Sequence, residues 1–243
     1  MQVQRSPWTA PDRYPEVFDF LKVQMAEKST KRRSRILSIG CSTGEEIDAI
    51  RRRLPEAEIV GVDISQENID RCSARFPDIQ FFCADFFSET PLRFEQKFDA
   101  VLVLSVLCRW PESKRLKNLS SLYAFSEFEF AIDRLDANID IGGLLVLINT
   151  NYSFSDTRIA KHYAAISNLK TSGFVRRFLR DGRRRTILQY RLPRVVVDWL
   201  WYAAVYIGDR GQSDKYIPEW ERRKNQWLRP VPGLGQCVFE KIK

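Results

Sequence analysis

Histidine is almost missing from this sequence, since His162 is the only one in 243 residues. The five cysteines are odd in number, and none of them forms a C-x-x-C pair. A zinc site needs clustered His and Cys ligands, and a disulfide framework needs an even set of cysteines at suitable spacing. We therefore expect no metal site and no disulfide framework, and we expect reduced, buried thiols of the kind found in cytoplasmic proteins.

Extended apolar segments are missing as well. No stretch reaches the roughly 18 uncharged apolar residues of a membrane-spanning helix, and residues 1–18 contain no apolar segment typical of a secretory signal. The 11 Gly and 11 Pro are too few for a collagen-like or linker-like chain. With 44% hydrophobic and 29% charged residues, the composition is typical of a folded globular protein. We expect a soluble protein of the cytoplasm.

The positive charge is concentrated toward the C-terminus. Residues 170–243 hold 17 Lys and Arg against 7 Asp and Glu, whereas the rest of the chain holds 22 against 24. The net charge of +8 therefore comes from the C-terminal region. Such a region can attract an anionic partner such as RNA or a membrane surface, or it can be an ordinary solvated face. Both alternatives stay open, although the sequence carries no RNA-binding domain signature.

Short apolar runs alternate with helical segments through most of the chain. We expect strands at 35–39, 59–63, 79–83, 100–104 and 144–148, and helices at 15–27, 45–53, 66–75 and 126–138. This alternation predicts an α/β fold with a doubly wound, Rossmann-like, mainly parallel sheet and right-handed crossovers. Residues 236–241 alternate in polarity and predict an antiparallel C-terminal strand.

The segment after residue 150 is less regular. Residues 156–169 are typical of a helix, and Asp181-Gly182 within 174–190 indicates a hairpin. The apolar, aromatic run at 195–207 is too short to span a membrane and favours a core or cap element. We interpret the chain as a single domain, with a helical cap at 1–34, a core at 35–150 and a basic, aromatic-rich C-terminal part at 151–243.

A glycine loop, Gly40-Cys41-Ser42-Thr43-Gly44, follows the first expected strand and opens a helix. Its glycines let the backbone approach a ligand, and the helix start presents free N–H groups. At the first strand of a doubly wound sheet, such a loop binds nucleotide-like cofactors. The dinucleotide fingerprint fails at Ser42 and Glu45, and the P-loop lysine is replaced by Glu45. The acidic helix start disfavours a phosphate and favours a cofactor with a cationic centre and an ammonium group.

With these features, residues 35–150 resemble the class I S-adenosylmethionine-dependent methyltransferases. The resemblance implies that Gly40, Cys41 and Gly44 lie against the methionine part of S-adenosylmethionine. It also implies that Asp63, which ends the second strand, binds both ribose hydroxyls, with Ile64 beside the adenine. Asp63 stands 23 residues after Gly40, close to the roughly 20 expected for a ribose-binding acid.

Further along the chain, the resemblance implies that Asp85 binds the adenine amino group and that Phe86 packs on the ring. Ser105, after the fourth strand, occupies the position near the transferable methyl group. Gly142-Gly143 resembles the family's turn before the fifth strand, with Ile141 in place of proline. The cofactor-binding residues implied in all are Gly40, Cys41, Ser42, Gly44, Glu45, Asp63, Ile64, Asp85, Phe86 and Ser105.

One departure concerns Ser38, which stands where the family commonly has an acidic residue two places before the first loop glycine. The loop version S-x-G-C-S-T-G-E-E is similar to that of the chemotaxis receptor methyltransferases, and there Glu45 would supply the charge facing the ammonium group. This likeness is local, because the segment from Ser105 to Trp110 differs from that branch. The segment also differs from the Asp/Asn-Pro-Pro-aromatic motif of nucleic-acid amino-methyltransferases.

We therefore expect an enzyme that transfers a methyl group from S-adenosylmethionine to an O, N or C nucleophile of a small acceptor. The alternative is a non-catalytic module that binds the cofactor, or RNA through the basic C-terminal region. No catalytic residue is assigned, since methyl transfer needs little beyond alignment of the reacting atoms.

Weaker candidates remain for roles around the acceptor. His162 is a general base or a solvated helix residue, and Cys108 faces the site or is a packing thiol. Arg109 fits beside a cationic cofactor only if it binds an anionic substrate. Residues 110–124 favour a substrate loop, and residues 8–18 favour either a lid over the cofactor or a packing helix.

Overall fold

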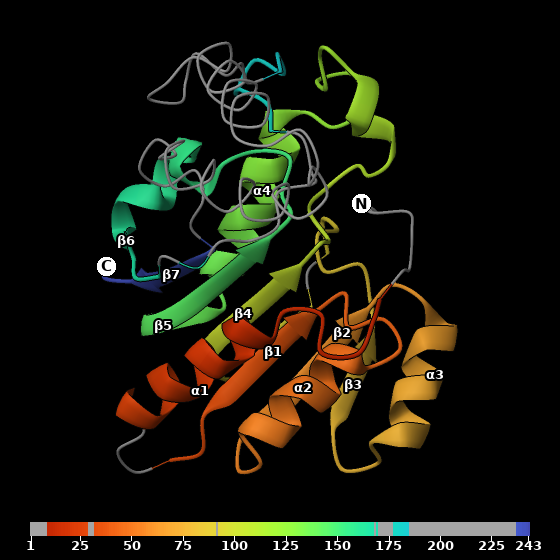
Figure 1. Cartoon of the computed structure of the whole chain (residues 1–243), viewed down its shortest axis with the longest axis vertical. Helices are drawn as coiled ribbons and strands as arrows, with labels where there is room; N and C mark the ends of the chain where they lie inside the picture. The colour runs from red at the N-terminus through yellow and green to blue at the C-terminus, as the bar shows by residue number, and fades with distance from the viewer. Residues whose placement is uncertain (1–8, 29–31, 91, 168, 170–176, 185–236) are drawn as a thin grey trace, which may run out of the picture. The chain divides into compact units, whose positions relative to one another are not determined.

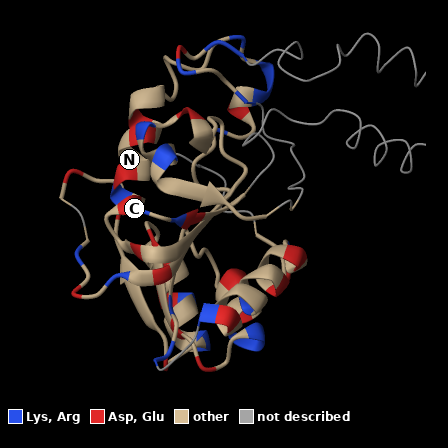
Figure 2. Ribbon diagram, turned by 90° about the vertical axis from the view of Figure 1, so that its left-hand side faces the viewer, with Lys and Arg blue, Asp and Glu red and all other residues tan. Residues whose placement is uncertain are grey.

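The computed structural model describes residues 9–28, 32–90, 92–167, 169, 177–184 and 237–243. They belong to one compact unit, made of residues 1–184 and 236–243, while residues 185–235 make up a second unit outside the described residues. The apolar element expected at 195–207 also falls outside them. In the described part, Lys and Arg are interspersed with Asp and Glu (Figure 2). The interpretation as a single domain stays a prediction.

A seven-stranded sheet forms the centre of the described unit, in the order β3-β2-β1-β4-β5-β7-β6. Its strands are β1 (Arg35–Ile39), β2 (Glu58–Asp63), β3 (Gln80–Cys83), β4 (Phe98–Leu104), β5 (Ile139–Ile148), β6 (Tyr163–Ala165) and β7 (Val238–Lys241). Neighbours from β3 through β5 pair in parallel, and β7 pairs antiparallel with β5 and β6. This arrangement confirms the predicted doubly wound, mainly parallel sheet with an antiparallel C-terminal strand (Figure 1).

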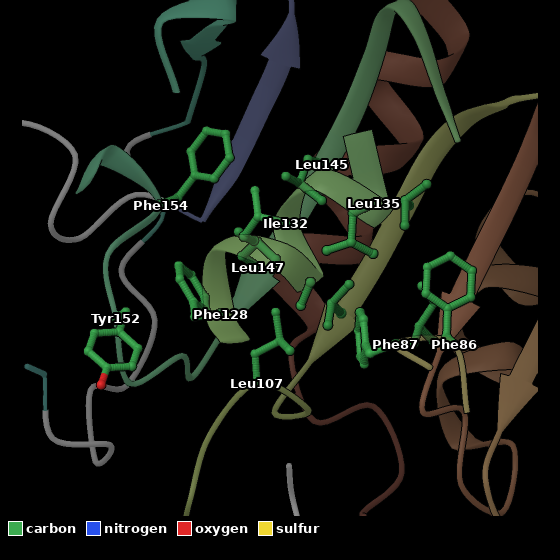
Figure 3. Packing of buried hydrophobic residues seen from close by; sticks show 14 of the residues in the cluster. Phe86, Phe87, Leu107, Phe128, Ile132, Leu135, Leu145, Leu147, Tyr152 and Phe154 are labelled. Atoms are coloured by element: carbon green, nitrogen blue, oxygen red, sulfur yellow. The ribbon is translucent and has the colours of Figure 1, made fainter. Parts of the chain in front are cut away.

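The α-helices of the described residues are α1 (Pro15–Lys28), α2 (Glu45–Arg53), α3 (Gln66–Arg75) and α4 (Phe125–Asp136). Buried side chains of α1, α2 and α3 share one apolar cluster with Ile36 and Ala100. Those of α4 share a second cluster with Leu37 and Val101, part of which Figure 3 shows. Because successive strand residues point to opposite faces, the sheet separates two apolar cores.

Helix α1 is amphipathic in the way the sequence predicts. Pro15 stands at its first position, where a fixed φ is favourable. The buried residues of the helix recur at helical spacing: Val17, Phe18, Leu21 and Met25. Burial of each side chain stabilises the fold by about 1.5–3 kcal/mol. The helix therefore anchors the residues before it, including Arg13 and Tyr14, to the sheet.

The glycine pair that the sequence predicts as a turn before the fifth strand lies inside that strand. The sequence favoured a turn at Gly142-Gly143, whereas β5 already begins at Ile139. The pairing with β4 shifts register in this stretch, from Phe98 opposite Ile139 to Ala100 opposite Leu144. The glycines lie in this irregular part of the strand. A bulge there absorbs the extra residues, so the pairing with β4 continues on both sides of it.

The helix expected at 156–169 is wrong. Residues 154–156 and 158–162 form short 3₁₀ helices, and β6 follows directly. Tyr163 in β6 lies opposite Lys241 in β7, so pairing with the C-terminal strand overrides the local helical pattern. The hairpin at Asp181-Gly182 is confirmed in its described part, where a bridge joins Phe178 to Arg184. None of the described helices is both long and apolar enough to cross a membrane.

Candidate functional site

The strand order reverses between β1 and β4, because β1 pairs with β2 on one side and with β4 on the other. The carboxyl ends of parallel strands meet at one edge of a sheet, and ligands bind at this edge where the order reverses. The glycine loop after β1, Asp63 at the end of β2 and Ser105 after β4 all fall here. The fold therefore brings three of the predicted site segments to one edge.

The glycine loop needs its glycines. Gly40 has a φ of +72°, and a Cβ there would lie 2.4 Å from Cγ2 of Val106. Gly44 has a φ of +92°, and a Cβ there would lie 2.9 Å from Cε2 of Phe76. Ser42 between them also has a positive φ, +52°. Larger residues at the glycine positions would strain the backbone and push the loop away from its neighbours.

Asp63 connects the glycine loop to the start of α3. Its Oδ2 accepts a hydrogen bond of 2.9 Å from Ser42 N, and its Oδ1 accepts from Ser65 N at 2.9 Å and Asn68 Nδ2 at 3.2 Å. The residue is only 8% exposed. A carboxylate has about four acceptor positions, so about one remains for a ligand unless Asn68 moves.

Glu46 is a buried carboxylate that the sequence analysis missed. Ser38 Oγ donates to its Oε2 over 3.0 Å, and Arg13 Nη2 lies 3.7 Å from its Oε1. Burial raises the pKa of Glu46 to about 8, although Arg13 and Ser38 oppose the shift. The available signal was helical spacing, because Glu46 stands four residues before the buried Ile50 on the apolar side of α2.

Glu45, the predicted ammonium partner, points to different groups. Thr43 Oγ1 donates to its Oε2 at 2.7 Å, and Arg75 Nη1 lies 3.7 Å from its Oε1. The carboxylate next to Ser38 is therefore that of Glu46, one residue further along. The assignment of Glu45 stays a prediction, and Glu46 is a second candidate for the same role.

Cys41 and Cys72 pack behind the loop as thiols. Cys72 Sγ donates to Ser42 O at 3.2 Å, and the side-chain hydrogen bond between the two sulfurs, together with burial, raises the pKa of Cys41. All five cysteines are free in the structure. Four are buried and Cys83 is exposed. Among the described residues, no group of three or more His, Cys, Asp or Glu side chains is arranged to hold a metal ion.

The segment after β3, which holds the predicted adenine partners Asp85 and Phe86, begins next to Asp63. Ala84 N donates to Asp63 O at 2.9 Å, which brings the end of β3 against the end of β2. Asp85 Oδ1 accepts from Phe87 N at 3.0 Å, and Ile64 is 45% exposed. Phe86 is buried and packs edge-to-face against Phe87 (Figure 3). Phe86 therefore belongs to the core on the α4 side, and its contact with adenine stays a prediction.

A polar network joins the ends of β4 and β5. Ser105 and Asn149, each directly after its strand, have positive φ values of +65° and +54°. Asn149 Nδ2 donates to Ser105 Oγ and to Tyr14 Oη, both at 2.8 Å, and Tyr14 Oη lies 3.1 Å from Ser105 Oγ. Strained backbone of this kind costs about 1–3 kcal/mol per residue and is concentrated at functional sites. Tyr14 brings the segment before α1 to the predicted methyl-transfer position.

Two weaker candidates, His162 and Arg109, lie at different places in the fold. His162 O accepts from Ile242 N at 2.8 Å, just beyond β7. Because β7 runs antiparallel to β5 with Glu240 opposite Leu144, this places His162 toward the amino ends of the parallel strands. It is therefore no general base for this site. Arg109, in contrast, is buried in the loop after β4.

Comparisons with known proteins find similarity to methyltransferases. Residues 36–125 match the sequence profile of a methyltransferase domain family. A tRNA (guanine-N(7)-)-methyltransferase from Rubrobacter xylanophilus is 39% identical over 61 residues, which cover 23% of this chain and 27% of the relative. The region matched by the family therefore spans β1 to the start of α4 and contains the glycine loop, Asp63 and Ser105.

Solved structures of methyltransferases are also similar. An amino pentose methyltransferase from Micromonospora echinaspora with bound S-adenosylmethionine is 19% identical with a TM-score of 0.43, covering 60% of this chain and 51% of that one. A sugar N-methyltransferase from Streptoalloteichus is 21% identical with a TM-score of 0.40, covering 60% and 52%. The chain thus spans about half the length of these structures and 27% of the curated relative. These likenesses identify no substrate for this chain.

Proposed function

We propose that residues 36–125, which match a methyltransferase domain family, form a class I, S-adenosylmethionine-dependent domain, and that the chain transfers the methyl group of S-adenosylmethionine to an O, N or C nucleophile on a small acceptor. The observation that carries the proposal is the 2.9 Å hydrogen bond from Ser42 N to Asp63 Oδ2. It holds the carboxylate at the end of β2 against the glycine loop after β1, so that a single ligand can contact both.

The cofactor's two polar ends have matching groups in this arrangement. For an ammonium group, Glu45 offers a partly exposed carboxylate. Glu46 offers a buried carboxyl group close to the glycine loop, which would pair with the ammonium group after losing the proton that its raised pKa retains in the free chain. Asp63 keeps about one acceptor position for a ribose hydroxyl, and a second becomes free if Asn68 Nδ2, the longest of its three hydrogen bonds at 3.2 Å, moves away. The donors at the start of α2 are flanked by acids, which disfavours a phosphate in this position.

The adenine end follows from the adjacent strands. Asp85 would accept from the adenine amino group, and the exposed side chain of Ile64 would cover the ring. Gly40, Cys41 and Gly44 would line the methionine part. The two glycines take positive φ values and have no side chains, so the backbone there can approach a ligand closely. When bound, S-adenosylmethionine supplies a methyl group activated on a sulfonium sulfur.

The chain's own contribution to the chemistry is alignment. Ser105, Tyr14 and Asn149 share hydrogen bonds on the β4–β5 side, so their positions are mutually fixed. Fixed groups of this kind can hold an acceptor in line with the methyl and the sulfur. No described residue is assigned as a general base.

The proposal is tested by calorimetric titration of the purified chain with S-adenosylmethionine, S-adenosylhomocysteine and NAD. We expect both adenosyl compounds to bind and NAD not to bind, because the loop fails the dinucleotide fingerprint and adds negative charge. Binding of NAD without a response to either adenosyl compound would overturn the proposal.

The acceptor is sought by mass spectrometry of molecules that remain with the purified chain, followed by a turnover assay that measures S-adenosylhomocysteine. A second arm uses transfer RNA, because one matched relative acts on tRNA. A small acceptor should give turnover at low and high salt alike, whereas RNA binding through phosphates falls steeply with salt. Cofactor binding without turnover on any acceptor would favour the non-catalytic module.

A further inference from the structure

Arg109 carries a buried positive charge that has no partner among the described residues. The residue is 9% exposed, and its Nε and Nη1 atoms are buried without a hydrogen bond. Together these two atoms carry three N–H donors. A guanidinium group removed from water without an acceptor is strongly unfavourable. The arrangement therefore indicates an acceptor that belongs to a ligand.

The backbone around Arg109 is held firmly. Arg109 N donates to Asn151 Oδ1 at 2.6 Å, and Ser113 N donates to Arg109 O at 2.7 Å. Asn151 Nδ2 also donates to Ser113 Oγ at 3.2 Å. One asparagine beyond β5 thus fixes both ends of the turn that carries Arg109. The guanidinium group is presented by a rigid segment, four residues after Ser105.

A second donor without a partner lies in the same region. Tyr123, at 0% exposure, has a hydroxyl without a hydrogen bond, and the charge of Arg109 acts on it. Burial raises the pKa of Tyr123 well above its usual value, so the phenol stays a neutral donor. Two buried donor groups without acceptors are best satisfied by an oxyanion.

The other charged groups around Arg109 either have partners or are exposed, so Arg109 is the group that remains to bind an anion. Arg13 faces Glu46 at 3.7 Å, and Arg177 Nη1 donates to Tyr152 O at 2.8 Å, so both have partners. Glu127, the acid whose charge acts on Tyr123, accepts from Ala124 N at 2.7 Å and serves as the cap of α4. Glu112, which acts on Cys108, is exposed.

We propose that Arg109, with the hydroxyl of Tyr123, binds an anionic oxygen group, a carboxylate or a phosphate, on the methyl acceptor. This inference rests on the proposed function and narrows it, because it makes the acceptor a small acid. An acidic acceptor also solves an electrostatic problem. The positive charges of Arg109 and of a sulfonium group oppose each other, and a negative group between them offsets both.

The test is thermal melting of the purified chain, with and without S-adenosylhomocysteine, during titration with sodium phosphate and separately with sodium acetate. Sodium chloride at equal ionic strength is the reference. We expect at least one anion to raise the melting temperature of the wild-type chain. In Arg109→Met, the apparent dissociation constant of that anion should rise by about ten- to a hundredfold, which is the scale expected for the loss of charge-assisted hydrogen bonds. Tyr123→Phe should weaken binding less.

Arg115→Met is the matched control, since Arg115 is exposed in the same loop. It should respond to the anions as the wild type does. Arg109→Lys keeps the charge and should retain part of the response. Without an anion, Arg109→Met should melt no lower than the wild type, because the charge it removes is unpaired; a lower melting temperature would indicate a structural role and contradict the proposal.

Two further results would overturn it: no anion response in the wild type, or an equal response in Arg109→Met. Stabilisation that requires transfer RNA and is absent with both small anions would assign Arg109 to nucleic acid instead. Calorimetry with S-adenosylhomocysteine separates this outcome from the proposed function. If the chain bound the anion through Arg109 but did not bind the adenosyl compound, the proposed anion site would stand and the proposed methyl transfer would be overturned.

Discussion

The two halves of the sheet's carboxyl edge are built in different ways. On the β1–β2 side, the site is mainly backbone: Gly40 and Gly44 take positive φ values, and Asp63 holds the loop through Ser42 N. On the β4–β5 side it is made of side chains from distant segments, since Tyr14 and Asn149 are separated by 135 residues. The first half is a local design, and the second exists only once the chain has folded.

This difference matters for what each half recognises. The backbone half presents main-chain groups and one fixed carboxylate, which suits a ligand that is always the same. The side-chain half contains buried polar groups whose identities can change without altering the sheet, as loops of α/β folds commonly do. We infer that the β1–β2 half is devoted to the cofactor and the β4–β5 half to the acceptor.

The largest effect is expected from Asp63→Ala. The change removes the acceptor for a ribose hydroxyl and also releases Ser42 N, Ser65 N and Asn68 Nδ2. Affinity for S-adenosylhomocysteine should fall by about 2–4 kcal/mol, the scale of hydrogen bonds to a charged group, which is about 30- to 1,000-fold. Calorimetric titration of variant and wild type measures it.

Asp70→Ala is the control for this prediction. Asp70 is an exposed acid in α3, and its only partner among the described residues is Gln66. Its removal changes the charge equally and should leave affinity unchanged. Thermal melting without ligand accompanies each titration, because Asp63 also stabilises the loop. If Asp63→Ala melted normally and bound within about twofold of the wild type, Asp63 would be a structural residue and the cofactor would lie elsewhere.

The contrast between the halves also explains what the sequence could predict. The alternation of apolar runs and helical segments predicted β1 to β4 and α1 to α4 closely, and α2 and α3 match their expected bounds. These elements depend on local periodicity. β6 was missed and β5 was given the wrong start, because both depend on pairing with strands far away in the sequence.

The two halves of the site also differ in how far the sequence could predict them. The positions of the glycine loop and Asp63 follow from motifs within one βαβ unit, where spacing is informative. The network of Ser105, Tyr14 and Asn149 could not be predicted, because nothing in a single sequence reveals contacts across 91 or 135 residues. Glu46 is an intermediate case. The motif that contains it was recognised, but whether its side chain points into the core depends on its position around the axis of α2.

The second prediction concerns the ammonium group and compares Glu45→Gln with Glu46→Gln. The variant that removes the true partner should lose about 1.5–3 kcal/mol of affinity for S-adenosylhomocysteine, and the other should lose much less. Burial next to Ser38 favours Glu46, whereas the loop resemblance favours Glu45. Ser38→Ala should have a small effect in either case. Small, equal effects at both glutamates would show that neither faces the cofactor.

The third prediction is a pH dependence of stability from Glu46. Its pKa is raised from 4.5 to about 8, so the folded chain keeps a proton that the unfolded chain releases. The free energy of unfolding should therefore fall by about 1.4 kcal/mol per pH unit between these values. Denaturation at pH 6 and pH 7 should show this fall in the wild type and not in Glu46→Gln. The same slope in both chains would contradict it.

The smallest effect is expected from Tyr14→Phe, which tests whether the side-chain half is one connected unit. The change removes a hydroxyl that lies 2.8 Å from Asn149 Nδ2 and 3.1 Å from Ser105 Oγ, and it keeps the buried ring. Ser105 and Asn149 still bond each other, so the free energy of unfolding should fall by only about 0.5–1.5 kcal/mol. Chemical denaturation measures this loss. Because the hydroxyl that is removed bonds to Ser105 and Asn149 and the ring is kept, affinity for S-adenosylhomocysteine should stay within about twofold of the wild type. If cofactor affinity fell as strongly as in Asp63→Ala, the two halves would not be separate, and the division of the edge between cofactor and acceptor would be wrong.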